Sequence, residues 1–306
     1  MYYFPYFRGR QYDLQALKAV AQQHLLPANI IPIIEPVRDI AALPKTIAAF
    51  VAHDQPLVVI ANSTVSDYAL TQQKLHDWSA WQDNPALIIG HVLTPTLVEA
   101  DVTPQPEHQT LLVARQYDDL VAAKQAGLLN APTHLLVPPE ARIRRLLDRP
   151  TIQLFDHAWL PEHPRTYADL PDGLFSDDWA TDLLTPYVGY SDYGIGGGHY
   201  SEHGYPARAV TIHLTYFKGS QLRIHRFVSD DHTDFKHPKE KFFQAVAKLA
   251  DWLPKQAASV QTAAQQLADY HTTQHFPGLG VVKRLSIMHH LQVMAAYFKQ
   301  NYPHSD

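Results

Sequence analysis

Carboxylates and histidines with the chemistry of general bases or metal ligands follow short apolar runs in this sequence. Glu35 closes the run IIPIIEPVR, His91 closes ALIIGH and Asp156 closes IQLFDH, while His213 lies within AVTIHLTYF. Imidazole and carboxylate groups transfer protons and ligate divalent cations. We therefore take Glu35, Asp156 and His213 as candidate general bases or ligands of a divalent metal, and the sequence identifies neither the metal nor any other cofactor.

Asp192 is the fourth candidate for catalysis. It lies in GYSDYG, at the start of a segment from residue 189 to 204 that holds six of the chain's 13 glycines. Because glycine gives the backbone freedom, this segment could close over a ligand and carry Asp192 with it. Aspartate also favours turns through local hydrogen bonds, so a structural role stands beside the catalytic one.

Arginines follow other apolar runs, at Arg8, Arg38 and Arg115. Guanidinium groups bind phosphate or carboxylate bidentately, so we expect an anionic ligand. We assign substrate binding to these arginines and to three further polar residues: Asn62, His91 and His225. Tyrosines that would suit a base or a sugar interleave with these positions, at Tyr3, Tyr6, Tyr12, Tyr190, Tyr193 and Tyr216. The alternative is that the arginines neutralise strand-end carboxylates, with Arg38 paired to Glu35.

The sequence contains no strong catalytic motif. It has no GxxxxGK[ST], HExxH or GxSxG pattern, and it has no cysteine, which excludes disulfides, thiolate nucleophiles and cysteine-based metal sites. It therefore leaves open whether the protein is an enzyme. The formal charge of -5 argues against a globally basic nucleic-acid-binding protein, although a local basic groove is compatible with it.

Hydropathy gives no sign of a membrane or secreted protein. No apolar stretch approaches about 18 residues, the length needed to span a bilayer, and the N-terminal MYYFPYFRGR lacks the order of a signal peptide. We expect no membrane insertion and a cytoplasmic location.

Eight apolar runs must position the polar residues: FPYFRGR, IIPIIEPVR, LVVIAN, ALIIGH, TLLVAR, HLLVPPE, IQLFDH and PYVGYSDY. Their hydrophobicity is continuous rather than alternating, which is typical of parallel strands buried on both faces. Segments of helical period lie between several of them, at Tyr12 to His24, Pro44 to Ala52, Asp67 to Trp81, Gln116 to Leu128 and Glu140 to Leu147. The pattern predicts an α/β fold, a TIM-like (β/α) barrel, with an open α/β sheet as the alternative. In both, the polar residues behind the runs meet at one rim.

The last third of the chain has a different pattern. Two β-rich runs, Ala209 to Phe217 and Gln221 to Ser229, are joined by Lys218-Gly219-Ser220 and predict a β-hairpin. Helical stripes follow from Pro238 onward. We expect a barrel over 1–253 that includes the glycine-rich loop and a hairpin insertion at 189–229, and a helical C-terminal region over 254–306 packed on the barrel.

Several of these segments together resemble the beta-protein family of bacteria and phages: YFPYFRGRQYDLQAL, IIPIIEPV, GYSDYG, AVTIHLTYF with HRFVSDD, and GLGVVKRLSIMHHL. The resemblance spans nearly the whole chain. It implies a barrel fold and, because such genes often lie near mobile elements or defence genes, an antiviral or mobile-element role. Positions that lie inside the family's motifs are Arg8, Glu35, Asp192, His213, His225 and His290.

Two classes of function follow as hypotheses. The first is a hydrolase or related enzyme that acts on a phosphate-bearing substrate, a nucleotide or nucleic acid, in antiviral defence. The second is a non-catalytic barrel that binds a ligand or a cognate protein as part of a defence or mobile-element system.

Overall fold

A computed structural model of the protein describes residues 1–71, 74–99, 109–130, 133–147, 150–155, 170–177, 187–198, 200, 208–231, 233–256 and 262–303. The chain forms two compact units. The first contains the described residues of Met1–Asp156 and Asp182–Tyr193, and the second contains those of His157–Thr181 and Gly194–Pro303.

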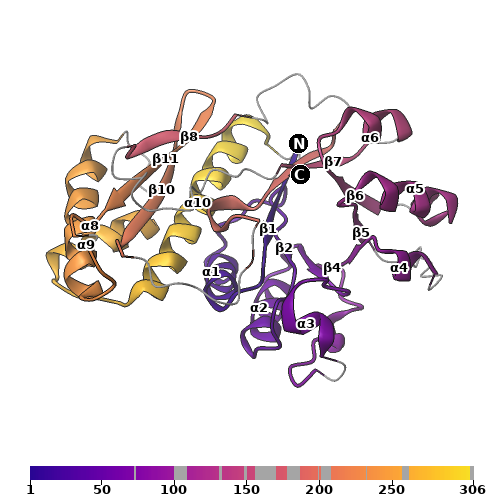
Figure 1. The fold of residues 1–306 in the computed structure, drawn as a ribbon, viewed down its shortest axis with the longest axis horizontal. Coiled ribbons are helices and arrows are strands. Elements are labelled where there is room, and N and C mark those ends of the chain that lie inside the picture. Colours follow the sequence, from indigo (N-terminus) through magenta and orange to yellow (C-terminus); the bar gives the residue numbers. More distant parts are fainter. Residues whose placement is uncertain are drawn as a thin grey trace. The chain divides into compact units, whose positions relative to one another are not determined.

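The first unit contains a closed barrel of eight strands (Figure 1). Every neighbouring pair is parallel, and β9 closes the barrel by pairing with both β7 and β1. Each strand overlaps one of the eight predicted apolar runs, so the TIM-like barrel and the common strand direction are confirmed. The strands are β1 (Tyr2–Phe7), β2 (Ile33–Ile34), β3 (Leu57–Ile60), β4 (Leu87–Val92), β5 (Thr110–Val113), β6 (Thr133–Val137), β7 (Ile152–Phe155) and β9 (Gly189–Asp192).

Side chains alternate between the inside and the outside of the barrel wall. On β5, Leu111 and Val113 belong to the interior cluster, whereas Leu112 packs outward with Leu120 and Ile143. Burial on both faces explains why the strands read as continuous apolar runs.

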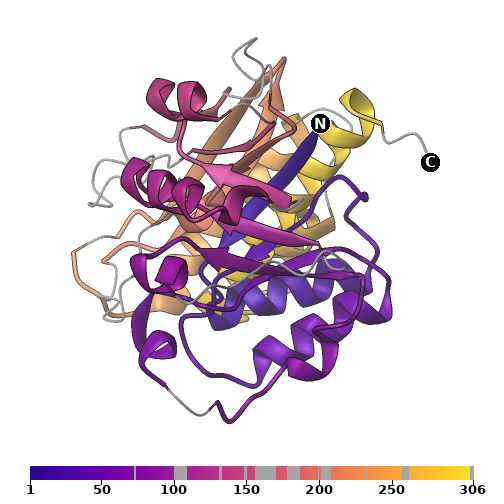
Figure 2. The same ribbon diagram turned by 90° about the vertical axis from the view of Figure 1, so that its right-hand side faces the viewer.

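Helices cover the outside of the barrel, and Figure 2 shows α1 and α2 side by side. The helices of this unit are α1 (Gln11–Gln22), α2 (Ala42–Ala52), α3 (Ser66–Leu70), α4 (Pro95–Glu99), α5 (Tyr117–Gln125) and α6 (Ala141–Leu146), with 3-10 turns η1 (Ser79–Trp81) and η2 (Leu128–Asn130). The expected helix from Asp67 to Trp81 is wrong beyond Leu70. Thr71 is extended, and the carboxylate of Asp39 accepts the backbone N–H groups of Leu75 and His76, so the chain has an alternative to helical bonding there.

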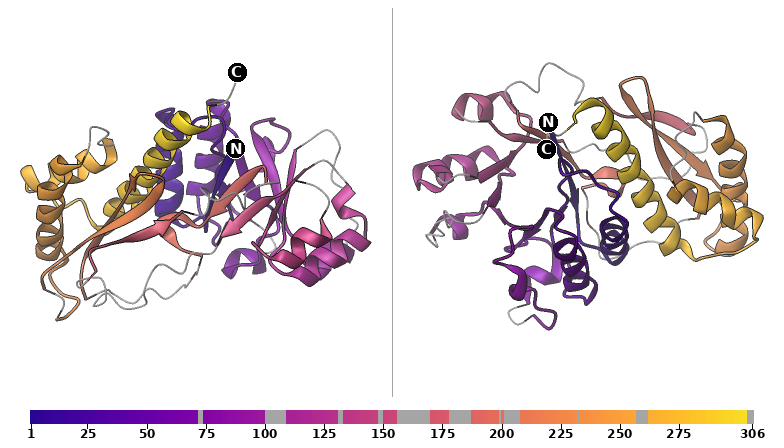
Figure 3. Two further views of the ribbon diagram at one scale, coloured as in Figure 1. Left: turned by 90° about the horizontal axis from the view of Figure 1, so that it is seen from above. Right: turned by 180° about the vertical axis from the view of Figure 1, so that it is seen from behind.

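The second unit combines a three-stranded antiparallel sheet, in the order β10-β11-β8, with helices (Figure 3). The predicted hairpin is confirmed: Lys218 pairs with Gln221 across a tight turn in which Gly219 has φ +64°. The elements are β8 (Asp172–Ser176), η5 (Gly194–Gly196), β10 (Thr211–Lys218), β11 (Gln221–Val228), α8 (Pro238–Trp252), η6 (Leu253–Lys255), α9 (Thr262–Thr272) and α10 (Leu279–Asn301).

The hairpin groups with the C-terminal helices rather than with the barrel strands. This differs from the boundary at residue 253 expected from the sequence. The physical reason is packing: β10 contacts α10 and α8, and β11 contacts α8 and the short strand β8. Among the described helices, none has the length and apolar character needed to cross a membrane.

Candidate functional site

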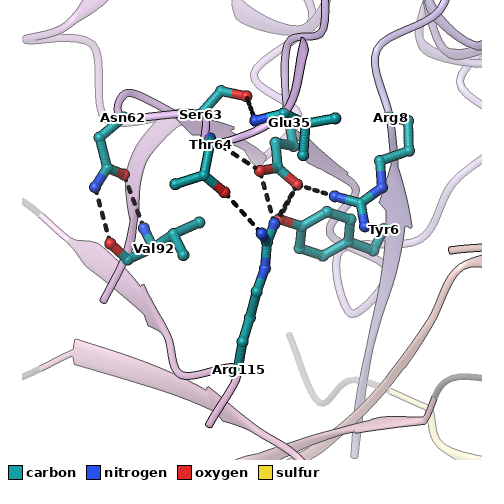
Figure 4. A network of polar contacts seen from close by, with 9 residues as sticks. Tyr6, Arg8, Glu35, Asn62, Ser63, Thr64, Val92 and Arg115 are labelled. Carbon is teal, nitrogen blue, oxygen red and sulfur yellow. Dashed lines mark hydrogen bonds and ion pairs between the residues drawn. The ribbon is translucent and has the colours of Figure 1, made fainter. Parts of the chain in front are cut away.

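A polar cluster lies inside the barrel at the carboxyl-terminal ends of its strands (Figure 4). Tyr6 is on β1, and Arg8, Glu35 and Arg115 follow β1, β2 and β5 by one or two residues. Period-2 alternation places all four on the inward-facing side, in line with the interior residues of the same strands. Thr64 joins them from the segment after β3. This is the end of a (β/α) barrel at which active sites are found.

Glu35 is the centre of this cluster, and its side chain is fully buried. One Nη of Arg115 donates to both carboxylate oxygens at 2.7 Å, and the other donates to Thr64 Oγ1 at 2.7 Å. Tyr6 Oη donates to Glu35 at 2.8 Å, Arg8 forms a short ion pair with it, and the backbone N–H of Thr64 lies at 3.4 Å. The carboxylate is thus bonded from several sides, as a buried charge must be.

Arg8 and Arg115 differ in exposure. Arg8 is 11% exposed and lies over the rings of Tyr193 and Tyr6, with its guanidinium carbon 5.0 and 5.6 Å from their centroids. Arg115 is 30% exposed. A ligand that enters the mouth therefore reaches Arg115 more easily, while the rings of Tyr6 and Tyr193 hold Arg8 in place.

The cluster carries more positive than negative charge. Two guanidinium groups face the single carboxylate of Glu35, and Asp119 is a more distant anion that interacts with Arg115. Burial is the largest single effect on Arg115 and opposes its charge, but Glu35 acting together with Tyr6 and Tyr193 outweighs burial and raises the pKa of Arg115. The pKa of Tyr6 is raised well above its usual value by burial and by Glu35, so its phenol stays protonated and donates.

Arg38 is not among the partners seen at Glu35. Its side chain is exposed, and the ion pairs of Glu35 are made by Arg8 and Arg115. The hypothesis of a Glu35–Arg38 pair is therefore corrected: nearness in sequence selected the wrong arginine, because inward-facing residues that follow β1 and β5 meet Glu35 inside the barrel.

Asn62 lies at the mouth with its amide bonded to the backbone of Val92. Its Nδ2 donates to the Val92 carbonyl and its Oδ1 accepts the Val92 N–H, both at 2.8 Å (Figure 4). These bonds extend the β3–β4 pairing beyond the last residue of β3.

His91 and Asp192 are on the outer side of the barrel wall. Their neighbours Val92 and Tyr193 belong to the interior cluster, so alternation turns these two side chains away from it. Asp192 is fully buried and accepts hydrogen bonds from Tyr3 and Tyr190, each at 2.8 Å. Burial lowers the pKa of His91, which keeps its imidazole neutral at pH 7. The two side chains do not share the mouth with Glu35.

The other predicted residues lie elsewhere. His213 and His225 are on β10 and β11 of the second unit, where His225 stacks on Trp252 and its Nδ1 lies 3.3 Å from Asp172 Oδ2. Asp156 lies outside the described residues. Of the predicted site residues, the structure brings together Arg8, Glu35 and Arg115.

Thr64 is a member of the cluster that sequence reasoning missed. Its position four residues after β3, in a segment with no periodic pattern, gives no signal in the sequence. Within the described parts of the chain, no group of three or more His, Asp or Glu side chains is placed to hold a metal ion.

No protein-family model, curated protein or solved structure matches this chain. The resemblance to the beta-protein family therefore stays a prediction.

Proposed function

We propose that this protein binds a phosphate-bearing ligand at the carboxyl-terminal mouth of its barrel, with Arg115 and Arg8 as the anion-binding groups. One observation carries the proposal: Arg115 is partly exposed, yet Glu35 and Thr64 hold its guanidinium in one orientation. A preorganised guanidinium loses little conformational freedom when it binds phosphate. The surplus of positive charge around Glu35 favours an anion.

The substrate class that we propose is a nucleotide or nucleic acid. Tyr193 and Tyr6 line the inside of the barrel beside Arg8, and aromatic rings stack on bases or sugars. The resemblance to a family associated with mobile elements and defence genes points in the same direction.

Hydrolysis of the bound phosphate ester is the catalytic form of this proposal. Glu35 would be the general base: it would take the proton of a water that attacks the phosphorus, and the ester oxygen would leave and take a proton from solvent. For this step the ligand would draw one Nη of Arg115 from the carboxylate and so release lone pairs of Glu35, while Thr64 still holds the other Nη in place.

A non-catalytic barrel that binds a ligand or a cognate protein is the second candidate. The observation that favours it is the saturation of Glu35, which accepts bonds from Tyr6, Arg8, Arg115 and Thr64 and so has little capacity left to take a proton.

Calorimetric titration with pyrophosphate and AMP tests the binding proposal. The wild-type protein should bind at least one of them, and Arg115→Gln should weaken binding about tenfold or more, because a charge-assisted hydrogen bond contributes roughly 1.5–3 kcal/mol. Arg142→Gln is the matched control: Arg142 is an exposed arginine of the same unit, paired with Glu140, and its replacement should leave binding unchanged. Absence of binding by the wild type, or equal binding by Arg115→Gln, would contradict the proposal.

Turnover separates the two candidate functions. Release of nitrophenol from bis(p-nitrophenyl) phosphate, measured with Mg²⁺, with Mn²⁺ and with EDTA, should be lost in Glu35→Gln if the protein is a hydrolase. Binding of AMP or pyrophosphate without any turnover supports the non-catalytic barrel.

A further inference from the structure

A pocket of about 500 Å³ lies within the second unit. Its lining comes from the beginnings of α8 and α10, from β10 and from the η5 turn. Most of its wall is apolar, with Val210, Val282 and Ile287 among the lining residues. Pockets of this size bind small organic molecules rather than water alone.

Two exposed apolar side chains extend this pocket to the surface. Phe235 is 63% exposed and Leu279 is 45% exposed, and both line it. Large exposed apolar side chains beside an apolar pocket indicate a binding surface, which a bound ligand would cover.

Two cations, Lys241 and Lys283, belong to the lining of the same pocket. Lys241 is 2% exposed, and its ammonium is bonded to the backbone oxygens of Arg208 and Asp234 and lies 3.4 Å from the Asp234 carboxylate and 3.6 Å from that of Asp231. Lys283 is a half-buried cation in the first turns of α10.

A helix terminus also contributes positive potential. Neither α8 nor α10 has a side-chain hydrogen bond at its N-cap. Glu240 lies in the first turn of α8, whereas α10 has no acidic residue in its first turn, so the positive end of the α10 dipole is the one that favours an anion at the pocket. Burial, and next the charge of Arg226, lower the pKa of His213 to about 4, so this pocket residue is neutral at pH 7 and adds no charge.

We propose that this pocket binds a small amphipathic anion, with its apolar part against Val210, Val282 and Ile287 and its single anionic group at Lys283 and the first turn of α10. A polyanion such as a nucleotide would place charged atoms against the apolar wall, which is unfavourable. A purely apolar molecule would gain nothing from the lysine. The site is separate from the barrel mouth, and the proposal is independent of the function proposed there.

The proposal is tested in the full-length protein with 8-anilinonaphthalene-1-sulfonate, an aromatic molecule with one sulfonate group whose fluorescence rises on binding. The measurement is the displacement of this probe by competitors. Octanoate should displace this probe, and octanol of the same chain length should be about tenfold weaker, a difference of about 1.4 kcal/mol for one charge contact. Lys283→Gln should remove the preference for octanoate and leave octanol unchanged. Phe235→Ser should weaken both competitors, because it removes apolar surface at the pocket.

Two control variants locate the effect. Lys299→Gln replaces an exposed lysine of the same helix, far along α10 from its first turn, and should bind octanoate as the wild type does. Arg115→Gln, at the barrel mouth, should also leave octanoate binding unchanged, so failure of the phosphate site and failure of this site are distinguishable. Absence of probe binding, equal displacement by octanol and octanoate, or unchanged binding in both Lys283→Gln and Phe235→Ser would overturn the proposal.

Discussion

Glu35 holds two arginines that repel each other, and this defines its role at the barrel mouth. Without a carboxylate between them, the Arg8 and Arg115 guanidinium groups would face each other in a partly buried space. A bound phosphate would bring its own negative charge and could take over Arg115 without leaving that guanidinium unpaired. Glu35 therefore stabilises the ligand-free state of the site, and its removal should affect folding before it affects chemistry.

Glu35→Gln should lower the free energy of unfolding by about 3 kcal/mol, near the lower end of the range for breaking a buried ion pair, because Arg115 retains some contact with water. The amide keeps the size of the side chain but removes the charge, and its NH₂ group would face guanidinium donors. Urea unfolding followed by circular dichroism measures the change.

Glu140→Gln is the control for Glu35. Glu140 is 37% exposed and its partner Arg142 is 59% exposed, so loss of this surface pair should cost only about 0–1 kcal/mol. If the two variants are equally stable, the ion cluster contributes nothing to folding and the structural role assigned to Glu35 is wrong.

The strands were predictable because their burial on both faces leaves a strong local signal. The runs are short and mostly apolar up to their polar tails, and the carboxyl ends of parallel strands must share one rim. Which side chains turn inward depends on period-2 alternation relative to the interior. This alternation separates Glu35, which faces inward, from Asp192, which pairs with Tyr3 on the outer side.

β8 could not be predicted in the same way. Its sequence DGLFS has no apolar run, and the strand exists because Gly173 and Leu174 pair with β11 from far along the chain. Tertiary pairing of this kind overrides local propensity. Thr64 was missed for a related reason, since its place beside Arg115 depends on barrel closure rather than on its neighbours in sequence.

Gly90 shows how tightly the inside of the barrel is filled by β3 and β4. A Cβ at this position would lie 2.5 Å from Ile60 Cδ1 and 3.0 Å from Val58 Cγ1. Gly90→Ala should therefore destabilise the protein by about 1–3 kcal/mol, the usual cost of overpacking a core. Urea unfolding of the variant measures this cost.

Ile60→Val removes the Cδ1 atom with which the new methyl group would clash. This substitution alone should lower the free energy of unfolding by about 0.5–1.5 kcal/mol. In the double variant the loss of unfolding free energy should be smaller than the sum of the two single losses by about 1 kcal/mol. The reason is that the methyl group added at residue 90 fills the space that the deleted methyl group of Ile60 leaves. Additive costs would show that the Gly90 effect arises from the backbone and not from packing in the barrel interior.

The two compact units divide the candidate chemistry of the whole molecule between them. The arginine–glutamate cluster belongs to the first unit, and His213, His225 and the amphipathic pocket belong to the second. The order of the elements along the chain does not predict this division. β8 belongs to the second unit, yet it precedes β9, which belongs to the first. A global measurement of stability can nevertheless report on a single buried group of one unit.

His289, on α10, is such a group. Its Nε2 lies 2.8 Å from the backbone oxygen of Thr215, to which the neutral ring donates, and its Nδ1 is buried with no hydrogen-bond partner among the described residues. Burial lowers the pKa of His289 to about 4, the Thr215 carbonyl opposes the shift, and neighbouring His290, whose Nδ1 lies 3.1 Å from Thr215 Oγ1, adds to it.

The stability of the protein should fall as the pH drops from about 6.5 to about 4. Above this window His289 is neutral in the folded and the unfolded chain and contributes no pH dependence. Within this window the unfolded chain binds a proton at His289 that the folded chain does not bind. The free energy of unfolding therefore falls by up to about 1.4 kcal/mol for each pH unit. Urea unfolding at a series of pH values measures this slope. His289→Gln retains an N–H donor for Thr215 but cannot titrate. The pH dependence of its unfolding free energy should therefore correspond to about one proton fewer than in the wild type. The control is His275→Gln, at an exposed position of the same unit, which should show the same pH dependence as the wild type. A His289→Gln slope equal to that of the wild type would mean that the imidazole takes up its proton in the folded state and is not held neutral by burial.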